Sequence, residues 1–264
     1  MLLQRLIVAA VGLPLLALLV LVAPEPVFAA VVQAILAIAA FEIVRSAAPG
    51  QPLTVPVSAA AVTALFVSLV RVVPEIPLWA FVLVAIFAIA GMLWSRARMA
   101  EHTGGWWLVA VLYTAVFGAH LVLIRNLDDG QMWLVVLLAA TFATDTGAYG
   151  VGRLIGRHRM VPRISPSKTW EGAAGGLLFG VAAAVLAPVL LELETEMPGP
   201  VLIAITLPLA AIAGDLIESA LKRRMGVKDM SGLLPGHGGF ADRLDSILIV
   251  SVCLYWILRW WQQT

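Results

Sequence analysis

Long apolar runs, each close to the length needed to cross a lipid bilayer, recur along the whole chain. A hydrocarbon layer about 30 Å thick requires roughly 20 mostly apolar residues per helix. Nine runs approach this length: Leu6–Ala23, Val27–Val44, Leu53–Val70, Leu78–Trp94, Gly104–Ile124, Met132–Gly152, Gly172–Leu191, Val201–Leu221 and Ser246–Trp261. Barrel strands would alternate in polarity over short stretches, whereas these runs are continuously apolar. The pattern predicts an all-α, polytopic integral membrane protein with about nine transmembrane helices, because helices satisfy their own backbone groups in lipid.

The composition supports this class, since 61% of the 264 residues are hydrophobic, 12% are charged, and the mean hydropathy is +0.98. Such values exclude an ordinary water-soluble domain. The first run also resembles a cleaved signal peptide, because Arg5 precedes it and the small residues Ala29 and Ala30 follow it. We favour a membrane span, since the run is long enough to cross and a second span follows directly. The single cysteine, Cys253, lies in the last run and predicts no disulfide.

Basic residues lie almost entirely on one side of the predicted membrane. With nine spans, 14 of the 17 Lys and Arg residues, Arg96 and Arg98 among them, fall on the side of the amino terminus. Only Arg71, Arg125 and Arg259 fall on the other side. Because Lys and Arg in short loops are retained in the cytoplasm, the split predicts a cytoplasmic amino terminus and an outward-facing carboxyl terminus.

Two predicted cytoplasmic loops, residues 153–171 and 222–245, are longer and chemically richer than the other connections. They contain all three lysines of the chain, Lys168, Lys222 and Lys228. A compact ammonium is a common phosphate ligand, so this sorting favours an anionic substrate, with binding of acidic lipid head groups as the alternative. We therefore divide the chain into a scaffold of residues 1–140, in which we find no specific motif, and a catalytic membrane region of residues 141–264.

Four carboxylates lie inside the predicted spans: Glu42, Asp145, Asp215 and Glu218. A charge near the bilayer centre costs about 2.5–3.5 kcal/mol, so such residues usually face a cavity, a partner or an ion. Glu42 lies one turn before Arg45, so a local ion pair explains it and we assign it no role. Asp145 lies at the cytoplasmic end of the sixth run, which places it beside the loop 153–171.

Acidic residues also flank the loop 222–245 on both sides. Asp215 and Glu218 lie three residues apart on one helical face, and Asp242 and Asp245 repeat this spacing where the last helix begins. The four carboxylates can therefore converge on a hard cation, which prefers oxygen ligands. The glycine-rich stretch 232–239 lies between them and lets backbone N–H groups approach an anion. Together these features are typical of metal-assisted phosphoryl or nucleotidyl transfer.

The same residues carry a resemblance to a known family. The stretch 219–245 contains Ser-Ala-Leu-Lys-Arg, Lys-Asp-Met-Ser and Gly-Leu-Leu-Pro-Gly-His-Gly-Gly-Phe-Ala-Asp-Arg-Leu-Asp. It resembles the signature of the phosphatidate cytidylyltransferase (CDP-diacylglycerol synthase) family, and the stretches 145–153 and 165–172 are similar to another region of that family. The resemblance covers roughly the carboxyl-terminal half of the chain. It implies transfer of the cytidylyl group of CTP to phosphatidic acid, which gives CDP-diacylglycerol and pyrophosphate in phospholipid biosynthesis.

The resemblance further implies Mg²⁺ as cofactor, with room for a second cation, and a homodimer without a nucleic acid partner. We expect the enzyme among the membrane lipids of a bacterial cytoplasmic membrane, and the split of basic residues predicts an active site on the cytoplasmic side. A phosphate monoester has its second pKa near 6, so phosphatidic acid is itself a nucleophile at neutral pH and no general base is demanded.

Site roles follow from charge, position and the resemblance. We expect metal ligation by the acids Asp215, Asp242, Asp245, Glu218 and Asp145. We expect catalytic contacts with the phosphates or the ribose from Lys222, Arg223, Lys228, Asp229, His237 and Lys168. We expect substrate binding by Ser165, Ser167, Ser219, Gly238, Gly239 and Arg243.

Two of these assignments have a specific local basis. An ion pair with Lys222, four residues further on, is an equal alternative to metal ligation for Glu218. Ser165 followed by Pro166 is typical of a helix N-cap and a first helical residue, so we expect a helix N-terminus there, aimed at a phosphate.

Three other functional classes are alternatives. A CTP-dependent lipid kinase of the polyprenol type would transfer the terminal phosphoryl group, so cytidine would not enter the lipid. An ion-coupled transporter usually carries acids at the membrane midplane and an inverted repeat, whereas here the acids cluster at one interface and we find no such repeat. A CDP-alcohol phosphotransferase would need its own aspartate motif within one helix, and Asp129-Gly130 lies instead in a predicted outward-facing loop.

Overall fold

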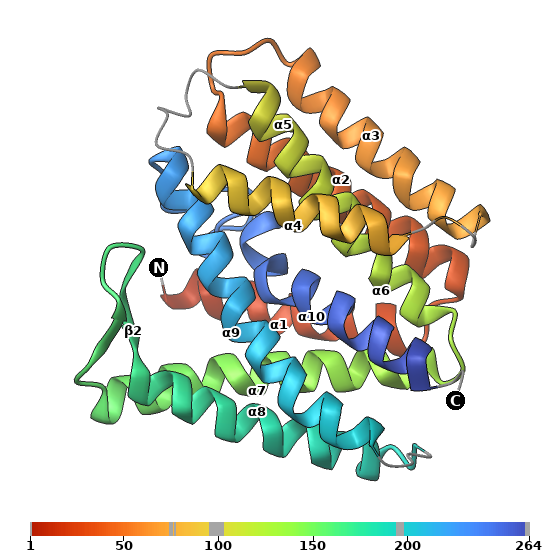
Figure 1. The fold of residues 1–264 in the computed structure, drawn as a ribbon, viewed down its shortest axis with the longest axis vertical. Coiled ribbons are helices and arrows are strands. Elements are labelled where there is room, and N and C mark those ends of the chain that lie inside the picture. The colour runs from red at the N-terminus through yellow and green to blue at the C-terminus, as the bar shows by residue number, and fades with distance from the viewer. Residues whose placement is uncertain (1, 74–75, 77, 95–102, 194–197, 262–264) are drawn as a thin grey trace. The chain divides into compact units, whose positions relative to one another are not determined.

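The computed structural model describes all residues except 1, 74–75, 77, 95–102, 194–197 and 262–264, and helices dominate it (Figure 1). The elements are α1 (Leu2–Leu21), α2 (Glu25–Ala47), α3 (Thr54–Val72), α4 (Leu78–Trp94), α5 (Thr103–Val111), the π-helix η2 (Leu112–Phe117), α6 (Gly118–Arg125), α7 (Gly130–Ile155), β1 (Arg159–Val161), β2 (Ser165–Thr169), α8 (Trp170–Leu190), α9 (Gly199–Met225) and α10 (Ala241–Trp261). Arg96 and Arg98, which contribute to the predicted orientation, lie outside the described residues.

Each predicted apolar run coincides with a helical segment of the described chain. The run Gly104–Ile124 corresponds to α5, η2 and α6, which follow one another without a break. Among the described residues, six segments are long and apolar enough to cross a membrane: 25–47, 54–72, 103–125, 130–155, 170–190 and 199–225. The all-α, polytopic membrane class is therefore confirmed, whereas the number of nine spans stays a prediction.

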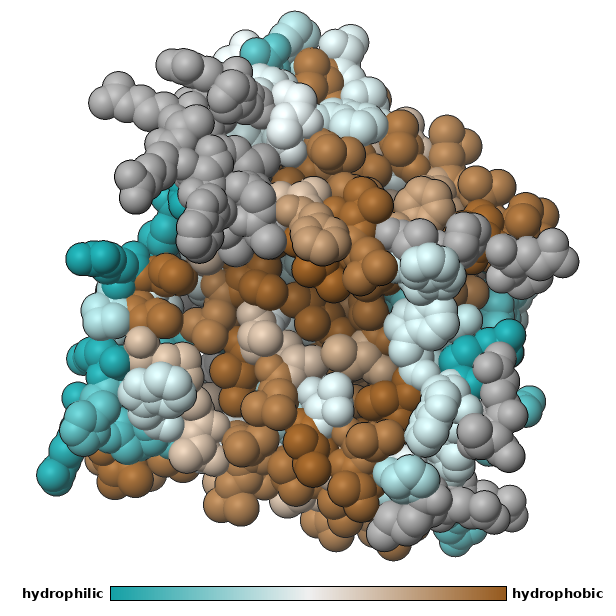
Figure 2. All heavy atoms as spheres, in the orientation of Figure 1, coloured by the Kyte–Doolittle hydropathy of each residue, from teal (hydrophilic) through white to brown (hydrophobic). Residues whose placement is uncertain are grey.

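Large apolar side chains cover much of the visible surface. Leu65, Phe87 and Leu178 are among those that are largely exposed on their helices. Figure 2 shows hydrophobic residues across the middle of the face in view and hydrophilic residues at its edges, one group of them at the left edge, where Figure 1 shows the strands. Apolar surface of this extent is unfavourable in water and is what a lipid-facing protein requires.

Contacts divide the chain into two compact units, each built from two stretches of sequence. The first unit comprises residues 1–123 and 221–244. Within it, α2 packs against α3, α5 and η2, and Leu36, Ala39 and Ala40 of α2 are fully buried. Helix α2 is therefore central to this unit. The predicted division after residue 140 separates the part of the chain without motifs from the part that contains them. Because it is not a division by compactness, these contacts do not test it.

The second unit comprises residues 124–220 and 245–264, and α7 and α8 pack closely along their length within it. Small residues make this approach possible. A Cβ atom on Gly172 would lie 2.8 Å from the backbone oxygen of Ala148, and one on Gly176 would lie 2.8 Å from that of Thr144. Small residues spaced four apart let membrane helices bring their backbones together. The close packing places the start of α8 beside the end of α7.

The connection between α7 and α8 is a β-hairpin, which corrects one prediction. Strands β1 and β2 pair antiparallel, with Val161 opposite Ser165. Ser165 is therefore not a helix N-cap. The helix begins at Trp170, and its N-cap is Thr169, whose hydroxyl accepts a hydrogen bond of 3.1 Å from the N–H of Gly172. The prediction was wrong because the fixed φ of Pro166 suits the start of a helix and also a strand at the edge of a sheet.

Candidate active site

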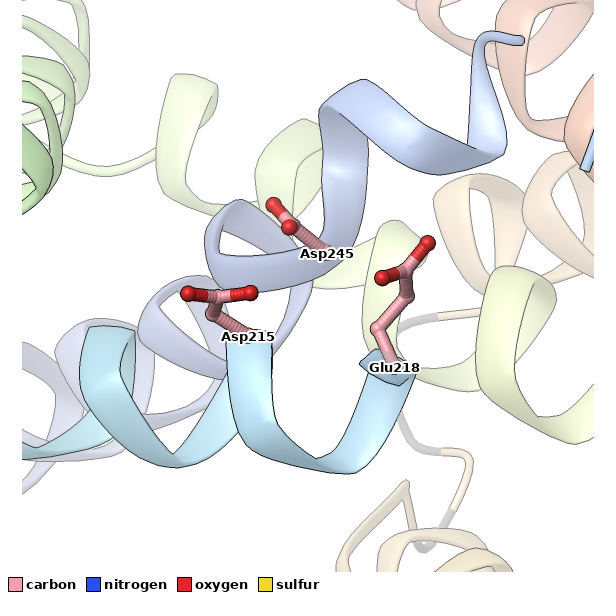
Figure 3. Close-up of side chains that lie close together, drawn as sticks. All are labelled: Asp215, Glu218 and Asp245. Atoms are coloured by element: carbon pink, nitrogen blue, oxygen red, sulfur yellow. The ribbon is translucent and has the colours of Figure 1, made fainter. Parts of the chain in front are cut away.

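Three of the five predicted metal ligands lie together in the second unit. Asp215 and Glu218 come from α9 and Asp245 comes from α10, and each offers a carboxylate oxygen within 4.8 Å of the other two (Figure 3). Glu218 is 1% exposed, so its carboxyl group is withdrawn from bulk solvent. The predicted convergence of four carboxylates is therefore found for these three residues, and Asp242 is not part of the group.

The residue before Asp215 explains how the two helices come close enough. A Cβ atom on Gly214 would lie 2.8 Å from the backbone oxygen of Asp245 and 2.9 Å from the Cα atom of Ser246. Only glycine fits at such a distance from a neighbouring backbone. Gly214 therefore lets α9 and α10 touch at the level of the acidic cluster, a contact that the spacing of residues within either helix does not predict.

A cavity of about 620 Å³ opens beside this cluster, within the second unit. Its charged lining residues are Asp145, Arg153, Arg159, Lys168, Asp215 and Asp245, and Ser167 also lines it. The ammonium of Lys168, on β2, lies 2.6 Å from a carboxylate oxygen of Asp215. The hairpin thus brings a lysine to the acidic cluster, and Asp145 lies beside the loop 153–171 as predicted.

Glu171, which was not among the predicted site residues, ties down the base of this hairpin. Its carboxylate accepts hydrogen bonds from the backbone N–H groups of Arg157, at 3.1 Å, and His158, at 3.2 Å. It also contacts the ring of His158. Because Glu171 lies in the first turn of α8, these bonds join the segment that enters β1 to the start of the helix that follows β2.

In the first unit, Asp242 is surrounded by hydrogen-bond donors. Its carboxylate lies 2.9 Å from the ammonium of Lys222 and accepts bonds of 2.8 Å from the backbone N–H groups of Met230 and Gly239. Burial acts to raise the pKa of this carboxyl, but the bond from Gly239 and the charge of Lys222 outweigh it and hold the pKa below its ordinary value. Asp242 precedes the apolar run of α10, and its carboxylate accepts hydrogen bonds from the loop 222–245.

The middle of the loop 222–245 is a compact turn. The backbones of Leu234 and Gly238 pair as in an antiparallel sheet, and the N–H of His237 donates a hydrogen bond of 2.8 Å to the carbonyl of Leu234. Gly236 and Gly238 have φ values of 76° and 80°, a conformation that favours glycine. The remaining predicted binding residues differ in exposure: Lys228, Asp229, Arg223 and Arg243 are exposed, whereas Ser165 and Ser219 are half-buried.

Glu42 corrects a second prediction. Arg45 donates to the backbone oxygens of Pro49 and Gln51. The carboxylate of Glu42 instead accepts hydrogen bonds from the hydroxyl of Ser231 and the N–H of Ala241. The predicted pairing within α2 is therefore wrong, because a buried carboxylate is best satisfied where several donors converge.

The donor set at Asp215, Glu218 and Asp245 fits a hard divalent cation. All three offer carboxylate oxygens, which Mg²⁺ and Ca²⁺ prefer, and none offers the nitrogen or sulfur that zinc sites favour. A lysine and two arginines line the adjoining cavity, so an anion is attracted to the place where a cation can be held. This combination can bind a phosphate-bearing substrate and stabilise charge on its leaving group.

Comparison with known proteins places these residues in a family. The model of the cytidylyltransferase family matches residues 3–261. Curated relatives named phosphatidate cytidylyltransferase include that of Mycobacterium bovis, 45% identical over 142 residues, which are 54% of this chain and 45% of the relative. That of Bacillus subtilis is 43% identical over 159 residues (58% of each chain), and that of Brucella suis is 36% identical over 170 residues (64% and 63%). The matched part thus spans 45–63% of the length of these relatives.

Proposed function

We propose, because the chain belongs to the cytidylyltransferase family, that it transfers the cytidylyl group of CTP to phosphatidic acid and releases pyrophosphate. One observation carries the proposal. Two members of the carboxylate cluster, Asp215 and Asp245, line a cavity of about 620 Å³ in a membrane protein, together with Lys168, which pairs with Asp215. Pockets of roughly 300–1,000 Å³ are typical of small-molecule sites, so the cavity has the size for a nucleotide or a lipid head group.

The proposed cofactor is Mg²⁺, held by Asp215, Glu218 and Asp245. A bound divalent cation would neutralise charge on the phosphates of CTP and on the departing pyrophosphate. Asp145, which lines the same cavity, is the proposed ligand of a second cation. These assignments rest on the shared oxygen chemistry of the four side chains.

The residues of the chain would act mainly by binding and orienting two polyanions. In the proposed reaction a phosphate oxygen of phosphatidic acid forms a bond to the α-phosphorus of CTP, and the bond from that phosphorus to the bridging oxygen of the β-phosphate breaks. Lys168, Arg153 and Arg159 line the cavity and would offset the repulsion between the substrates. Because the lipid phosphate is already largely dianionic near neutral pH, no side chain is needed as a general base.

The proposed location is the cytoplasmic membrane of a bacterium, with the amino terminus and both polar loops in the cytoplasm. Phosphatidic acid lies in the leaflet with its phosphate at the interface, and CTP arrives from the aqueous side. The connection that carries Lys168 also carries Arg157, Arg159 and Arg163, and Arg153 lies in the last turn of α7 before it, which is the charge expected of a cytoplasmic loop. A homodimer stays a prediction.

The reaction can be tested with purified protein in mixed micelles of detergent and phosphatidic acid. CTP labelled in the cytosine ring should place its label in a chloroform-soluble lipid, whereas label in the γ-phosphate should leave as pyrophosphate. Omission of phosphatidic acid is the control. Transfer of the γ-label to lipid, with the ring label kept in CDP, would instead establish a lipid kinase. The absence of any lipid product in the presence of Mg²⁺ would refute both assignments.

A further inference from the structure

Glu42 is a buried carboxylate of α2 that contacts a loop almost two hundred residues away in sequence. It is 2% exposed. Its two oxygens accept hydrogen bonds of 2.6 Å from the hydroxyl of Ser231 and 2.9 Å from the N–H of Ala241. Ala241 is the first residue of α10, where orphan N–H groups and the helix dipole favour a negative charge. Glu42 therefore joins both ends of the stretch 231–241, within the first unit.

The loop has no room for a side chain where it passes this carboxylate. A Cβ atom on Gly239 would lie 2.6 Å from each oxygen of Glu42. Gly239 is not among the residues with positive φ, and the three atoms nearest to an added methyl group all belong to Glu42. The absence of a side chain at Gly239 therefore makes room for the carboxylate of Glu42.

A second side chain of α2 supports the same contact. Ser46 lies four residues after Glu42, on the same helical face, and its hydroxyl donates to the backbone oxygen of Met230. From the other side, Asp242 accepts the N–H groups of Met230 and Gly239. The loop 230–241 is therefore held between two carboxylates, one from α2 and one from α10.

We propose that Glu42 is a positioning residue, which holds the loop 230–241 in the conformation that binds the anionic substrates. The inference rests on the proposed function, because the loop bears His237 and continues from Lys228 and Asp229. It gives the amino-terminal helices a part in the reaction beyond that of a scaffold. A carboxylate is suited to this task because it accepts from two donors at once without offering a proton.

The first test compares Glu42→Gln with the wild type in steady-state kinetics. Glutamine keeps the size but replaces one acceptor oxygen with a donor, so the loop is ordered for a smaller fraction of the time. If that fraction is about one tenth, the KM for CTP or phosphatidic acid rises about tenfold, while saturating substrate restores kcat to within about twofold. A purely structural role would reduce the amount of active protein and lower kcat at unchanged KM, and that result would overturn the proposal.

Glu25→Gln is the matched control for this test. Glu25 lies at the other end of α2, where it pairs with Arg71 at a partly exposed site, 2.6 Å apart. The same substitution there should leave both KM values unchanged. A similar rise in KM in both variants would show a general effect of charge loss in α2 and would also overturn the proposal.

The glycine provides a second test that does not depend on the stability of one variant. Gly239→Ala should lower kcat/KM at least tenfold in the wild type, where the methyl group meets Glu42. In a Glu42→Ala background the same change should cost less than about threefold, because the obstacle has gone. Equal effects of Gly239→Ala in the two backgrounds would refute the match between the two residues.

Hydrogen exchange separates failure of this inference from failure of the proposed reaction. Backbone amides of residues 230–241 should exchange faster in Glu42→Gln than in the wild type, whichever substrates the protein uses. If the wild type makes no lipid product but the exchange difference is present, the reaction is wrong and the contact stands. Unchanged exchange in the variant would overturn the role of Glu42, even in an active enzyme.

Discussion

Asp242 and Asp245 lie three residues apart at the start of α10, yet their surroundings are different. Asp242 is satisfied by Lys222 and by two backbone N–H groups. Asp245 lies near two other carboxylates, Asp215 and Glu218. A carboxylate among donors contributes to stability, whereas one among carboxylates is repelled until a cation binds. The same residue type therefore serves two purposes within one helical turn.

The two aspartates should respond differently to the same substitution. Asp245→Asn should leave the unfolding midpoint unchanged or raise it, because a like charge is removed, and should lower kcat/KM by at least about 100-fold through loss of a cation ligand. Asp242→Asn should lower the free energy of unfolding by about 3 kcal/mol, because Lys222 loses its buried partner. Thermal unfolding and Mg²⁺ titrations of activity in detergent check both.

Each variant serves as the other's control, because the change in size and charge is identical. An Asp245→Asn protein with wild-type activity and Mg²⁺ dependence would contradict the proposed cation site. An Asp242→Asn protein as stable as the wild type would contradict the structural role of its hydrogen bonds.

Residue types and their spacing along the helices predicted part of the candidate active site. Asp215 and Glu218 could be placed on one face from their spacing, and Asp245 could be expected near them because α9 and α10 flank a single loop. Glu42 was misassigned, since Arg45 is its neighbour along the helix and its actual partners, Ser231 and Ala241, are distant in sequence. Helical periodicity predicts which residues are neighbours within one helix, but it does not predict contacts between residues that are distant in sequence.

At the scale of elements, the close packing of α7 and α8 determines where the hairpin stands. The hairpin leaves α7 and enters α8, and Lys168 reaches Asp215 from its second strand. Any change that moves the two helices apart would therefore also move the lysine. The site depends on small residues that have no chemistry of their own.

Gly176→Ala should reveal this dependence. The added Cβ would lie 2.8 Å from the backbone oxygen of Thr144, so the helices must separate. We expect the free energy of unfolding to fall by about 1–3 kcal/mol, as for other overpacked interiors. Gly150→Ala on α7 is the matched control, because nothing lies within 4 Å of its added methyl group. There the better helix propensity of alanine should stabilise by up to about 1 kcal/mol. Unfolding in detergent measures both, and equal effects would contradict the packing argument.

The elements themselves were largely predictable because the apolar runs are long and continuous. The hairpin was not, since Arg159–Val161 and Ser165–Thr169 are short strands without clear alternation, and Pro166 is compatible with more than one structure. The break between helix and strand is decided by tertiary contacts, such as those of Glu171 with the backbone of Arg157 and His158. Such contacts produce no periodic pattern of apolar and polar residues, so they cannot be predicted from the sequence pattern.

At the scale of the whole molecule, each compact unit combines two stretches that are far apart in the sequence. The stretch 221–244 belongs to the first unit, whereas the parts of α9 and α10 that carry the acidic cluster belong to the second. Both units therefore contain residues of the recognised motif. This interleaving explains why a helix without any motif, α2, can bear a residue that contacts the motif directly.

Membrane orientation can be tested across a single helix of the second unit. Helix α7 has 26 residues, which at about 1.5 Å each exceed the hydrocarbon thickness of about 30 Å. Asp128 precedes it and Arg163 follows it, and both are exposed. With Cys253→Ala as background, single Asp128→Cys and Arg163→Cys variants provide one thiol on each side.

In intact spheroplasts, a membrane-impermeant maleimide should label Asp128→Cys and should label Arg163→Cys only after the membrane is permeabilised. The physical reason is that the basic hairpin is retained in the cytoplasm, while the connection that contains Asp128 and Asp129 carries a single basic residue, Arg125. The Cys253→Ala protein without an added cysteine controls for background labelling. The reverse pattern would place the proposed active site outside, away from cytoplasmic CTP. Labelling of both thiols from the same side would mean that α7 does not cross the bilayer, and the split of basic residues would then need another explanation.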